Sequence, residues 1–401
     1  LVVVEHDEET IREADHIIDL GPGAGQNGGR LVASGTLAGL KKIPASVTGA
    51  SFNGNPHKIY SPLRPYRKRA RLKVIGAVEN NLKGIDVEFP LRTFICITGV
   101  SGSGKSTLLK ETVYKTLHNR LNKQKSRVKN CKGIKGWQSL DRVLEVDHSP
   151  IGRTLRSVPA SYVGFLGDIR KLFAMTPSAR ARGYRPGRFS FNTSGGRCES
   201  CKGHGAFKVA MSFLPDVYVR CETCSEMRFN QETLNITYKG KNISEILNFT
   251  FDEAAAFFSA VPSIQRAVRL VCDIGLGYLC LGQASPTLSG GEAQRIKLAE
   301  ELSRSGRGHT FYILDEPTTG LHLADVENLL NVLQALVDQG NTIAVIEHNM
   351  EIIKEADYVI DLGPEGGSRG GEVVATGSPL ELIASSNGSH TAKYLKKYLN
   401  A

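Results

Sequence analysis

A glycine-rich segment has the residue types and the spacing of a phosphate-binding loop (P-loop). Residues 99–106 read Gly-Val-Ser-Gly-Ser-Gly-Lys-Ser, which satisfies the pattern G-x-x-x-x-G-K-[ST]. The apolar run 94–98 precedes this loop and a helical stretch follows it, which is the strand–loop–helix context that the pattern requires. Backbone N–H groups of such a loop turn towards phosphate oxygens, and the helix N-terminus adds its positive end. The residues expected to contact ATP are Gly99, Ser101, Gly102, Ser103, Gly104, Lys105, Ser106 and Thr107.

Lys105 and Ser106 have separate expected roles in this loop. The lysine would reach the β- and γ-phosphates, and the serine hydroxyl would bind Mg²⁺. A glycine- and serine-rich turn beside an unrelated lysine is the alternative. The complete pattern in its required context disfavours that alternative.

Two carboxylates end a second apolar strand, which reads Thr-Phe-Tyr-Ile-Leu-Asp-Glu at 310–316. A strand that delivers an Asp to the C-terminal edge of a P-loop sheet places it where Mg²⁺ binds, so Asp315 is an expected Mg²⁺ ligand. The adjacent Glu316 is suited to polarise the attacking water. A further buried strand, 342–346, leads to His348, which could contact the γ-phosphate or could be structural. The residues expected to act in catalysis are Lys105, Glu316 and His348.

A second anion-binding sequence lies between the P-loop and the carboxylates. Residues 288–295 read Leu-Ser-Gly-Gly-Glu-Ala-Gln-Arg, and LSGGE followed by a helix at this position resembles the signature of ABC-type ATPases. Ser289, Gly290 and Gly291 would then stand at a helix N-terminus and contact phosphate. In ABC proteins the signature closes over ATP held by another ATPase domain, so the resemblance implies that this chemistry needs a pair of domains.

The long interval between P-loop and signature contains Cys198-Glu-Ser-Cys201 and Cys221-Glu-Thr-Cys224. Two CxxC pairs at this spacing are typical of a zinc site in which four thiolates form a tetrahedron. Four free cysteines are the alternative, and His204 could compete as a ligand although the cysteines already fill four positions. Between the pairs, 207–213 and 217–220 are expected to form a hairpin. The remaining cysteines are expected to be buried as small apolar residues: Cys96, Cys131, Cys272 and Cys280.

The two ends of the chain repeat each other. Residues 4–35 align with 346–377 without a gap, so that Val-Glu-His faces Ile-Glu-His and both copies contain Asp-Leu-Gly-Pro. A duplication is therefore expected, with the tail of one domain copy preceding most of a second copy. By this repeat His6 matches His348 and would belong to the site of an upstream copy.

The expected fold is α/β, a P-loop NTPase of ABC type with a large inserted helical signature subdomain and a four-cysteine zinc module. The expected divisions are the tail of a first ABC domain at 1–40, a basic linker at 41–71, the P-loop part of a second ABC domain at 72–150, an insertion at 151–275 with the zinc module near 195–230, the rest of the second ABC domain at 276–385 and a C-terminal tail at 386–401.

Charge and hydropathy narrow the classes of partner. No apolar run approaches the ~18 residues that a membrane span needs, so a transporter with its own membrane helices is excluded, and the absence of a secretion signal favours the cytoplasm.

Fifty Lys and Arg against 40 Asp and Glu leave a net charge of +10, which suits a polyanion. The linker could be a solvated connector or a basic strap along nucleic acid. Arginines interleaved with aromatics at 180–192 could contact phosphates and stack on bases, or could form a packed loop.

Together these features resemble the C-terminal half of the UvrA family, the damage-sensing subunit of bacterial nucleotide excision repair. The resemblance implies a tandem ABC ATPase that binds damaged double-stranded DNA as a homodimer. It would hydrolyse ATP with Mg²⁺ to switch between DNA-bound states and would load the helicase-like partner of the excinuclease through a region outside this chain. The supporting segments, besides the P-loop, the signature and the cysteine pairs, are 80–83, 149–153, 180–184, 186–192, 315–322 and 345–348.

Two positions depart from the family pattern. His148 stands where the family usually has a glutamine that contacts Mg²⁺ and water, and an imidazole does not combine an amide's donor and acceptor. Ser225 and Glu226 replace a glycine-containing turn after Cys224, so a differently shaped second cysteine turn is expected. Two alternative functions remain at this point: a UvrA-like paralogue that protects against a DNA-binding drug, and an ABC subunit of a separate transporter, which the zinc insertion disfavours.

Overall fold

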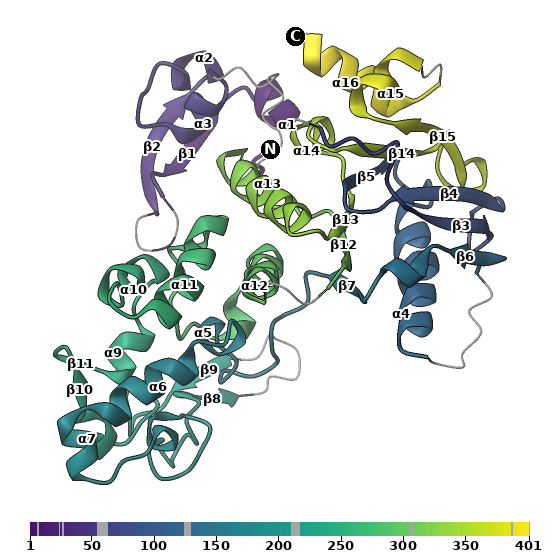
Figure 1. The fold of residues 1–401 in the computed structure, drawn as a ribbon. Helices are drawn as coiled ribbons and strands as arrows, with labels where there is room; N and C mark the ends of the chain where they lie inside the picture. Colours follow the sequence, from purple (N-terminus) through teal and green to yellow (C-terminus); the bar gives the residue numbers. More distant parts are fainter. Residues whose placement is uncertain are drawn as a thin grey trace. The chain divides into compact units, whose positions relative to one another are not determined.

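The computed structural model describes residues 1–5, 8–23, 25, 28–53, 63–123, 130–209, 217–304, 308–321, 323–385 and 388–400 (Figure 1). Its contacts divide the chain into two compact units. The first comprises 1–23, 28–147 and 304–401, and the second comprises 24–27 and 148–303. His6 and the tip of the expected hairpin, 210–216, lie outside the described residues. The domain boundaries expected from the sequence stay predictions.

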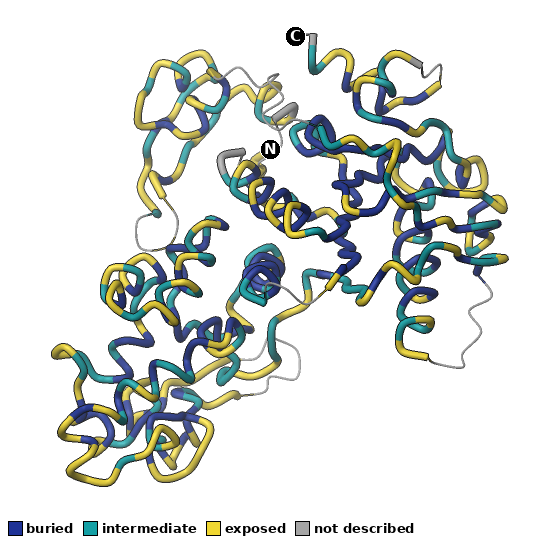
Figure 2. Tube along the Cα trace, in the orientation of Figure 1, coloured by how far each residue is buried: buried dark blue, intermediate teal, exposed yellow. Residues whose placement is uncertain are grey.

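A six-stranded sheet with strand order β15-β14-β5-β13-β12-β7 forms the centre of the first unit. Five of its strands are parallel and β15 pairs antiparallel with β14. The two central strands, β5 and β13, are mostly apolar, and all their residues except Gly99 are buried, as expected of a parallel sheet (Figure 2). The strands are β5 (Phe94–Gly99), β7 (Arg142–Val146), β12 (Thr310–Asp315), β13 (Thr342–Ile346), β14 (Tyr358–Gly363) and β15 (Glu372–Gly377).

A smaller antiparallel sheet and several helices complete this unit. The sheet has the order β4-β3-β6, and its Leu72 and Phe89 share one hydrophobic core with Ile95, Leu108 and Phe311. Its strands are β3 (Arg71–Ala77), β4 (Ile85–Pro90) and β6 (Gly133–Lys135). The helices are the π-helical η2 (Thr107–Tyr114), which continues as α4 (Lys115–Leu121), and α13 (Leu323–Asp338), α14 (Met350–Lys354), α15 (Pro379–Ser385) and α16 (His390–Asn400).

The repeat in the sequence is also a repeat in structure. β1 (Ile17–Gly21) and β2 (Arg30–Gly35) pair antiparallel with a bulge after Asp19, and β14 and β15 pair in the same register with a bulge after Asp361. Asp19 accepts hydrogen bonds from the hydroxyls of Ser46 and Thr48. Asp361 accepts the matching pair from Ser389 and Thr391, so the repeat continues past residues 40 and 385. The short helices of the first copy are α1 (Glu8–Glu13), α2 (Leu37–Leu40) and α3 (Val47–Ser51).

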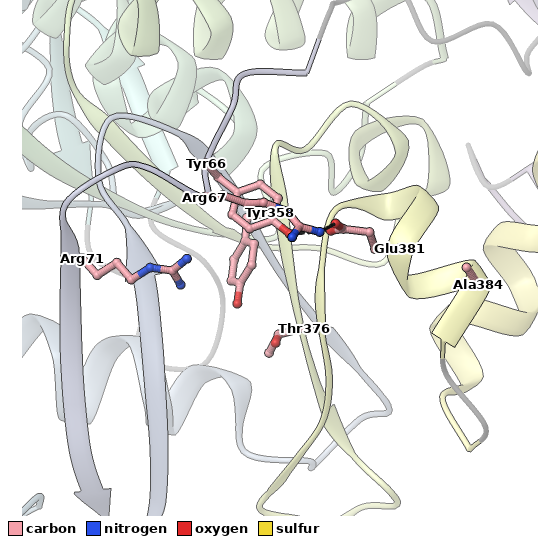
Figure 3. Close-up of a pocket in the computed structure, with 7 residues that line it drawn as sticks. All are labelled: Tyr66, Arg67, Arg71, Tyr358, Thr376, Glu381 and Ala384. Atoms are coloured by element: carbon pink, nitrogen blue, oxygen red, sulfur yellow. Dashed lines mark hydrogen bonds and ion pairs between the residues drawn. The ribbon is translucent and has the colours of Figure 1, made fainter.

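The part of the expected linker that precedes β3 is docked on the first unit. Arg64 forms ion pairs with Asp338 and Asp357 at 2.6 and 3.2 Å. Arg67 pairs with Glu381, and Tyr66 donates to the same carboxylate (Figure 3). Arg64 and Arg67 are therefore paired with carboxylates of the chain itself, and the two interpretations of the linker stay predictions.

The second unit is mainly helical, as expected of an inserted signature subdomain. Reciprocal side-chain caps explain where two of its helices begin, because Asn242 and Glu245, and likewise Thr250 and Glu253, bond each other's backbone N–H groups. None of the described helices of either unit is long and apolar enough to cross a membrane. The helices are α5 (Pro159–Tyr162), α6 (Leu166–Met175), α7 (Pro177–Ala181), α8 (Gln231–Leu234), α9 (Ile243–Leu247), α10 (Phe251–Phe257), α11 (Pro262–Val271) and α12 (Gly290–Ser303). The strands are β8 (Ala206–Val209), β9 (Val217–Arg220), β10 (Thr237–Tyr238) and β11 (Lys241–Asn242).

Candidate functional site

The P-loop follows β5 and has a backbone that requires its glycines. Gly99, Gly102 and Gly104 have φ angles of 130°, 74° and 104°, in the region that favours glycine. A Cβ atom at Gly99 would lie 2.0 Å from the carbonyl oxygen of Leu362. One at Gly104 would lie 2.9 Å from the side chain of Leu82. The loop is thus closely packed against its neighbours at Gly99 and Gly104, where a side chain would displace them, whereas Gly102 is required for its backbone conformation.

Lys105 lies over this loop. Its Nζ atom is 2.9 Å from the carbonyl oxygens of both Gly99 and Val100. Burial lowers the pKa of Lys105, while the charges of Glu316 and Asp315 act in the opposite direction. The ammonium group therefore shares one electrostatic environment with the two carboxylates at the end of β12, as a phosphate-binding lysine beside a metal site would.

Asp315 ends β12 and carries an ion pair that the sequence reasoning above missed. Lys110, one turn beyond Ser106 on η2, places its Nζ atom 2.9 Å from Asp315 Oδ2 and 3.2 Å from Glu145 Oε1. Burial alone would lower the pKa of Lys110, but the hydrogen bond to Asp315 and its charge outweigh burial and raise it. The sequence offered one indication that Lys110 lies near the expected Mg²⁺ site. Lys110 follows Ser106 by four residues, and residues i and i+4 share one face of a helix.

Glu316 and His348 come together at the same edge of the sheet. The Nε2 atom of His348 is 3.7 Å from Oε1 of Glu316, and both side chains are about half exposed. Glu316 has a φ angle of 45°, and its N–H donates to the carbonyl oxygen of Ile346 at 2.9 Å. Burial and the neighbouring Lys105 lower the pKa of His348, so the neutral imidazole is favoured near pH 7.

Glu347 is a buried carboxylate that joins two loops, and it too was missed from the sequence. It accepts hydrogen bonds from the backbone N–H and the hydroxyl of Thr318 at 2.9 and 2.7 Å. It also accepts from the backbone N–H groups of His348 and Asn349 at 2.9 and 3.2 Å. Burial raises the pKa of Glu347, although these hydrogen bonds act to lower it. The sequence could have indicated this structural role, because Glu347 lies between the apolar strand 342–346 and the candidate catalytic residue His348.

The signature lies in the second unit, at the N-terminus of α12. Ser289 and Glu292 cap this helix reciprocally, with Ser289 N donating to Glu292 Oε2 at 2.7 Å and Glu292 N donating to Ser289 Oγ at 3.2 Å. Ser289 and Gly290 are exposed, and Gly291 is half-buried. His148 belongs to the same unit, where a Cβ atom at Gly290 would lie 3.1 Å from its Cβ atom. The expected residues therefore form two groups, one in each compact unit.

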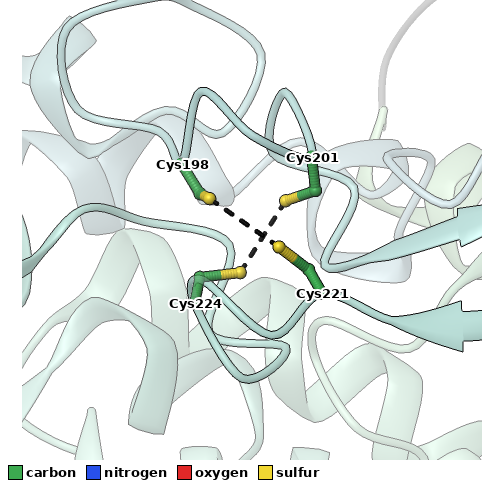
Figure 4. Close-up of side chains that lie close together, drawn as sticks. All are labelled: Cys198, Cys201, Cys221 and Cys224. Atoms are coloured by element: carbon green, nitrogen blue, oxygen red, sulfur yellow. Dashed lines mark hydrogen bonds between the residues drawn. The ribbon is translucent and has the colours of Figure 1, made fainter.

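The four expected zinc ligands lie together and point towards one another (Figure 4). The Sγ atoms of Cys198 and Cys221 are 4.0 Å apart, those of Cys201 and Cys224 are 3.7 Å apart, and all four lie within 4.8 Å of one another. A tetrahedral zinc ion with Zn–S bonds of about 2.3 Å sets sulfur–sulfur separations of about 3.8 Å, so the cluster fits this ion. Burial would raise the pKa of Cys221, but hydrogen bonds from the backbone of Cys224 and from its thiol help lower it to about 6. His204 is outside the cluster.

The chain is similar to known proteins over its whole length. No protein-family model matches the chain. The UvrABC system protein A of Aquifex aeolicus is 56% identical over 399 residues, which are 100% of this chain and 43% of that protein. The same protein from Methanothermobacter thermautotrophicus is 56% identical over 402 residues, 100% of this chain and 41% of the relative. The crystal structure of UvrA2 from Deinococcus radiodurans superposes with a TM-score of 0.91 at 47% identity, over 99% of this chain and 47% of that one.

The chain belongs to the UvrA family. It spans about two fifths of the length of the curated relatives that it matches. The expected fold class, an α/β ABC-type ATPase domain with an inserted helical subdomain, is confirmed by the match to a solved UvrA2 structure.

The second cysteine turn, where the sequence departs from the UvrA pattern, has the same left-handed backbone as the first. In the first cysteine turn Lys202 and Gly203 have φ angles of 50° and 80°, and in the second Ser225 and Glu226 have φ angles of 46° and 68°. The second turn therefore has the same left-handed positions as the first, and the expectation that it differs from the usual turn of the family stays a prediction. Left-handed backbone costs a residue other than glycine about 1–2 kcal/mol, so Ser225 and Glu226 adopt this conformation at a cost in stability.

The arginine- and aromatic-rich segment of this UvrA family member is partly a packed loop. Phe189 and Phe191 are 1% and 2% exposed, so they do not offer faces for stacking on bases. Arg188 pairs with Glu232 and lies over the ring of Tyr184. The arginines of this segment that are exposed are Arg180, Arg182 and Arg185.

The hairpin between the cysteine pairs is present, with β8 and β9 antiparallel on either side of the tip. Of the other cysteines Cys96 is buried as expected, whereas Cys131, Cys272 and Cys280 are only partly buried.

Proposed function

We propose that this chain forms one ATPase domain of a UvrA-type DNA-damage sensor that acts in nucleotide excision repair. The observation that carries the proposal is the meeting of Lys105, Asp315, Glu316 and His348 in one unit of a chain 56% identical to UvrABC system protein A. A transporter subunit is disfavoured by the same relatives, and by the buried four-cysteine cluster in the second unit.

The P-loop would bind ATP through its backbone N–H groups and through Lys105, whose ammonium would exchange two carbonyl oxygens for the β- and γ-phosphates. Ser106 and Asp315 would hold Mg²⁺. When bound, this ion neutralises charge on the phosphate oxygens. Glu316 would take a proton from the attacking water, and neutral His348, 3.7 Å away, would donate a hydrogen bond to the γ-phosphate.

Exposed apolar residues of the first repeat copy support a second ATPase domain. Ile18 and Leu20 on β1 are 63% and 66% exposed, whereas their repeat partners Ile360 and Leu362 on β14 are 0% and 1% exposed beside β5. In the second copy, β5, the strand that leads into the P-loop, pairs with β14 and covers these residues. Within the part of the chain that the structure describes, β1 has no such neighbouring strand. An upstream ABC domain would supply that strand. Its signature would complete the Lys105 site, and Ser289 of this chain would complete the upstream site.

The proposed partners are damaged double-stranded DNA, a second copy of the protein and the helicase-like partner of the excinuclease. The net charge of +10 and the exposed Arg180, Arg182 and Arg185 support contact with DNA phosphates. Zinc held by the four cysteines would keep the hairpin module folded for recognition of damage. The proposed location is the cytoplasm.

Two measurements on the full protein test this function. Lys105→Ala should abolish hydrolysis at one of two ATP sites, and an unchanged stoichiometry of bound ATP would contradict the proposed site. The logarithm of DNA affinity should fall steeply and linearly with the logarithm of salt concentration. A flat salt profile would show that the positive charge does not contact DNA.

A further inference from the structure

A second glycine-rich loop packs against the outer side of the P-loop. This loop, residues 365–371, connects β14 to β15. The backbone N–H of Gly367 donates to the carbonyl oxygen of Gly102 at 3.0 Å, and that of Gly371 donates to the carbonyl oxygen of Ser103 at 3.1 Å. Two successive carbonyl groups of the P-loop are thus held from outside the nucleotide site.

Holding these carbonyls sets the direction of the phosphate-binding groups. A trans peptide is planar, and its C=O and N–H groups point in opposite directions. The bond to the Ser103 carbonyl therefore orients the N–H of Gly104 away from the second loop. The bond to the Gly102 carbonyl likewise orients the N–H of Ser103, which closes the turn by donating to Val100 at 3.2 Å.

Asn81 joins the two loops through its side chain. Its Nδ2 group donates to the carbonyl oxygen of Gly102 at 2.9 Å and to that of Gly367 at 3.2 Å. The backbone beside it is also tied to the second loop, since Lys83 N donates to Gly371 O at 3.1 Å. One amide thus contacts the P-loop and the loop that holds it.

The glycines of the second loop are needed for this close approach. A Cβ atom at Gly366 would lie 2.5 Å from the carbonyl oxygen of Ser101, and one at Gly371 would lie 1.9 Å from the carbonyl oxygen of Asn81. At Gly370 a Cβ atom would lie 3.1 Å from the Cα atom of Ser103 and 2.2 Å from Glu365 O. Any side chain at these three positions would displace the P-loop or its support.

We propose that Asn81 and the loop 365–371 are positioning elements of the nucleotide site, which preorganise the P-loop N–H groups for phosphate. This inference rests on the proposed function, because it assigns a role at the same site. The sequence repeat extends it, since Gly25, Gly28 and Gly29 match Gly367, Gly370 and Gly371. The matching loop of the first copy would support the P-loop of the upstream domain.

The test compares Asn81→Ala with Lys73→Ala in the full protein. Lys73 lies on β3 in the same unit, outside both loops, and its half-exposed side chain pairs with Glu88 at 2.5 Å, so it is a control for the loss of a polar side chain. Asn81→Ala should raise the dissociation constant of a fluorescent ATP analogue and the KM for ATP by about tenfold, from two lost hydrogen bonds. The value of kcat should stay within about twofold, because the bonds act on ground-state binding.

Asn81→Ser keeps a hydroxyl donor on a shorter side chain and should give an intermediate dissociation constant. It also provides a second variant if Asn81→Ala does not fold. An unchanged dissociation constant in a folded Asn81 variant, with normal binding by the wild type, would overturn this inference alone. Failure of the wild type to bind the analogue, or binding unaffected by Lys105→Ala, would instead overturn the proposed function. A loss of kcat with unchanged KM would also contradict the inference.

Discussion

Lys110 places its ammonium nitrogen 2.9 Å from the carboxylate of Asp315, so the proposed Mg²⁺ ligand already carries a cation supplied by the helix that follows the P-loop. The same ammonium is 3.2 Å from Glu145 on β7. Lys110 therefore ties the ends of two neighbouring strands together. It also competes with a metal ion for Asp315, since both are cations drawn to one carboxylate.

This competition predicts that Lys110→Met lowers the Mg²⁺ concentration needed for half-maximal ATP hydrolysis by about fivefold, because one opposing charge is removed. Titration of Mg²⁺ at saturating ATP measures the effect. Lys115→Met is the control, since Lys115 begins the continuation of the same helix but pairs with Glu111. A higher Mg²⁺ requirement in Lys110→Met, or an equal shift in both variants, would show that Lys110 does not compete with the metal.

Glu316 is predicted to act as the general base. Glu316→Gln keeps the shape of the side chain but removes its capacity to accept a proton, so hydrolysis should fall by about 100-fold or more. Binding of ATP should remain, because the P-loop and Lys105 are unaltered. Single-turnover hydrolysis and equilibrium binding of ATP separate the two effects, and substantial turnover in this variant would assign the base to another residue.

Glu347 is predicted to position His348. In Glu347→Gln an amide NH₂ replaces one carboxylate oxygen and would face the N–H donors of His348 and Asn349 or of Thr318. A buried donor left without an acceptor costs about 1–3 kcal/mol. The thermal midpoint should fall, and kcat should fall by about tenfold or more because the catalytic loop moves.

Thr318→Val is the matched control for Glu347, because it removes one of the four donors and leaves the other three. Its loss of kcat should be clearly smaller than that of Glu347→Gln. If Glu347→Gln lowers the thermal midpoint but has the same kcat as the wild type, Glu347 stabilises the fold and does not position His348 for catalysis.

The cysteine cluster is predicted to bind about one zinc ion per chain. Metal analysis of purified protein should find this stoichiometry, and Cys221→Ser should lose the metal and lower the thermal midpoint of the second unit, since ligand binding is coupled to folding. Cys280→Ser, at a partly buried cysteine outside the cluster, should retain the metal. A folded wild-type protein without metal would refute the zinc site.

Residue spacing along the chain was sufficient to predict the motifs whose chemistry is local. The P-loop, the carboxylates after an apolar strand, the signature and the two CxxC pairs each place their groups through a single turn, helix start or strand end. Such geometry follows from backbone periodicity, so residue types at given intervals suffice to predict it. The internal repeat was equally visible, because its register is a property of the linear chain.

The meeting of distant residues, in contrast, follows from the tertiary fold. Lys110 and Asp315, Glu347 and Thr318, and Asn81 and Gly367 lie far apart in the chain and come together because their elements pack against one another in the fold. Packing also buries Phe189 and holds Ser225 in a left-handed backbone. Both outcomes depend on which elements pack against these residues in the folded chain. Residue spacing along the sequence does not carry that information.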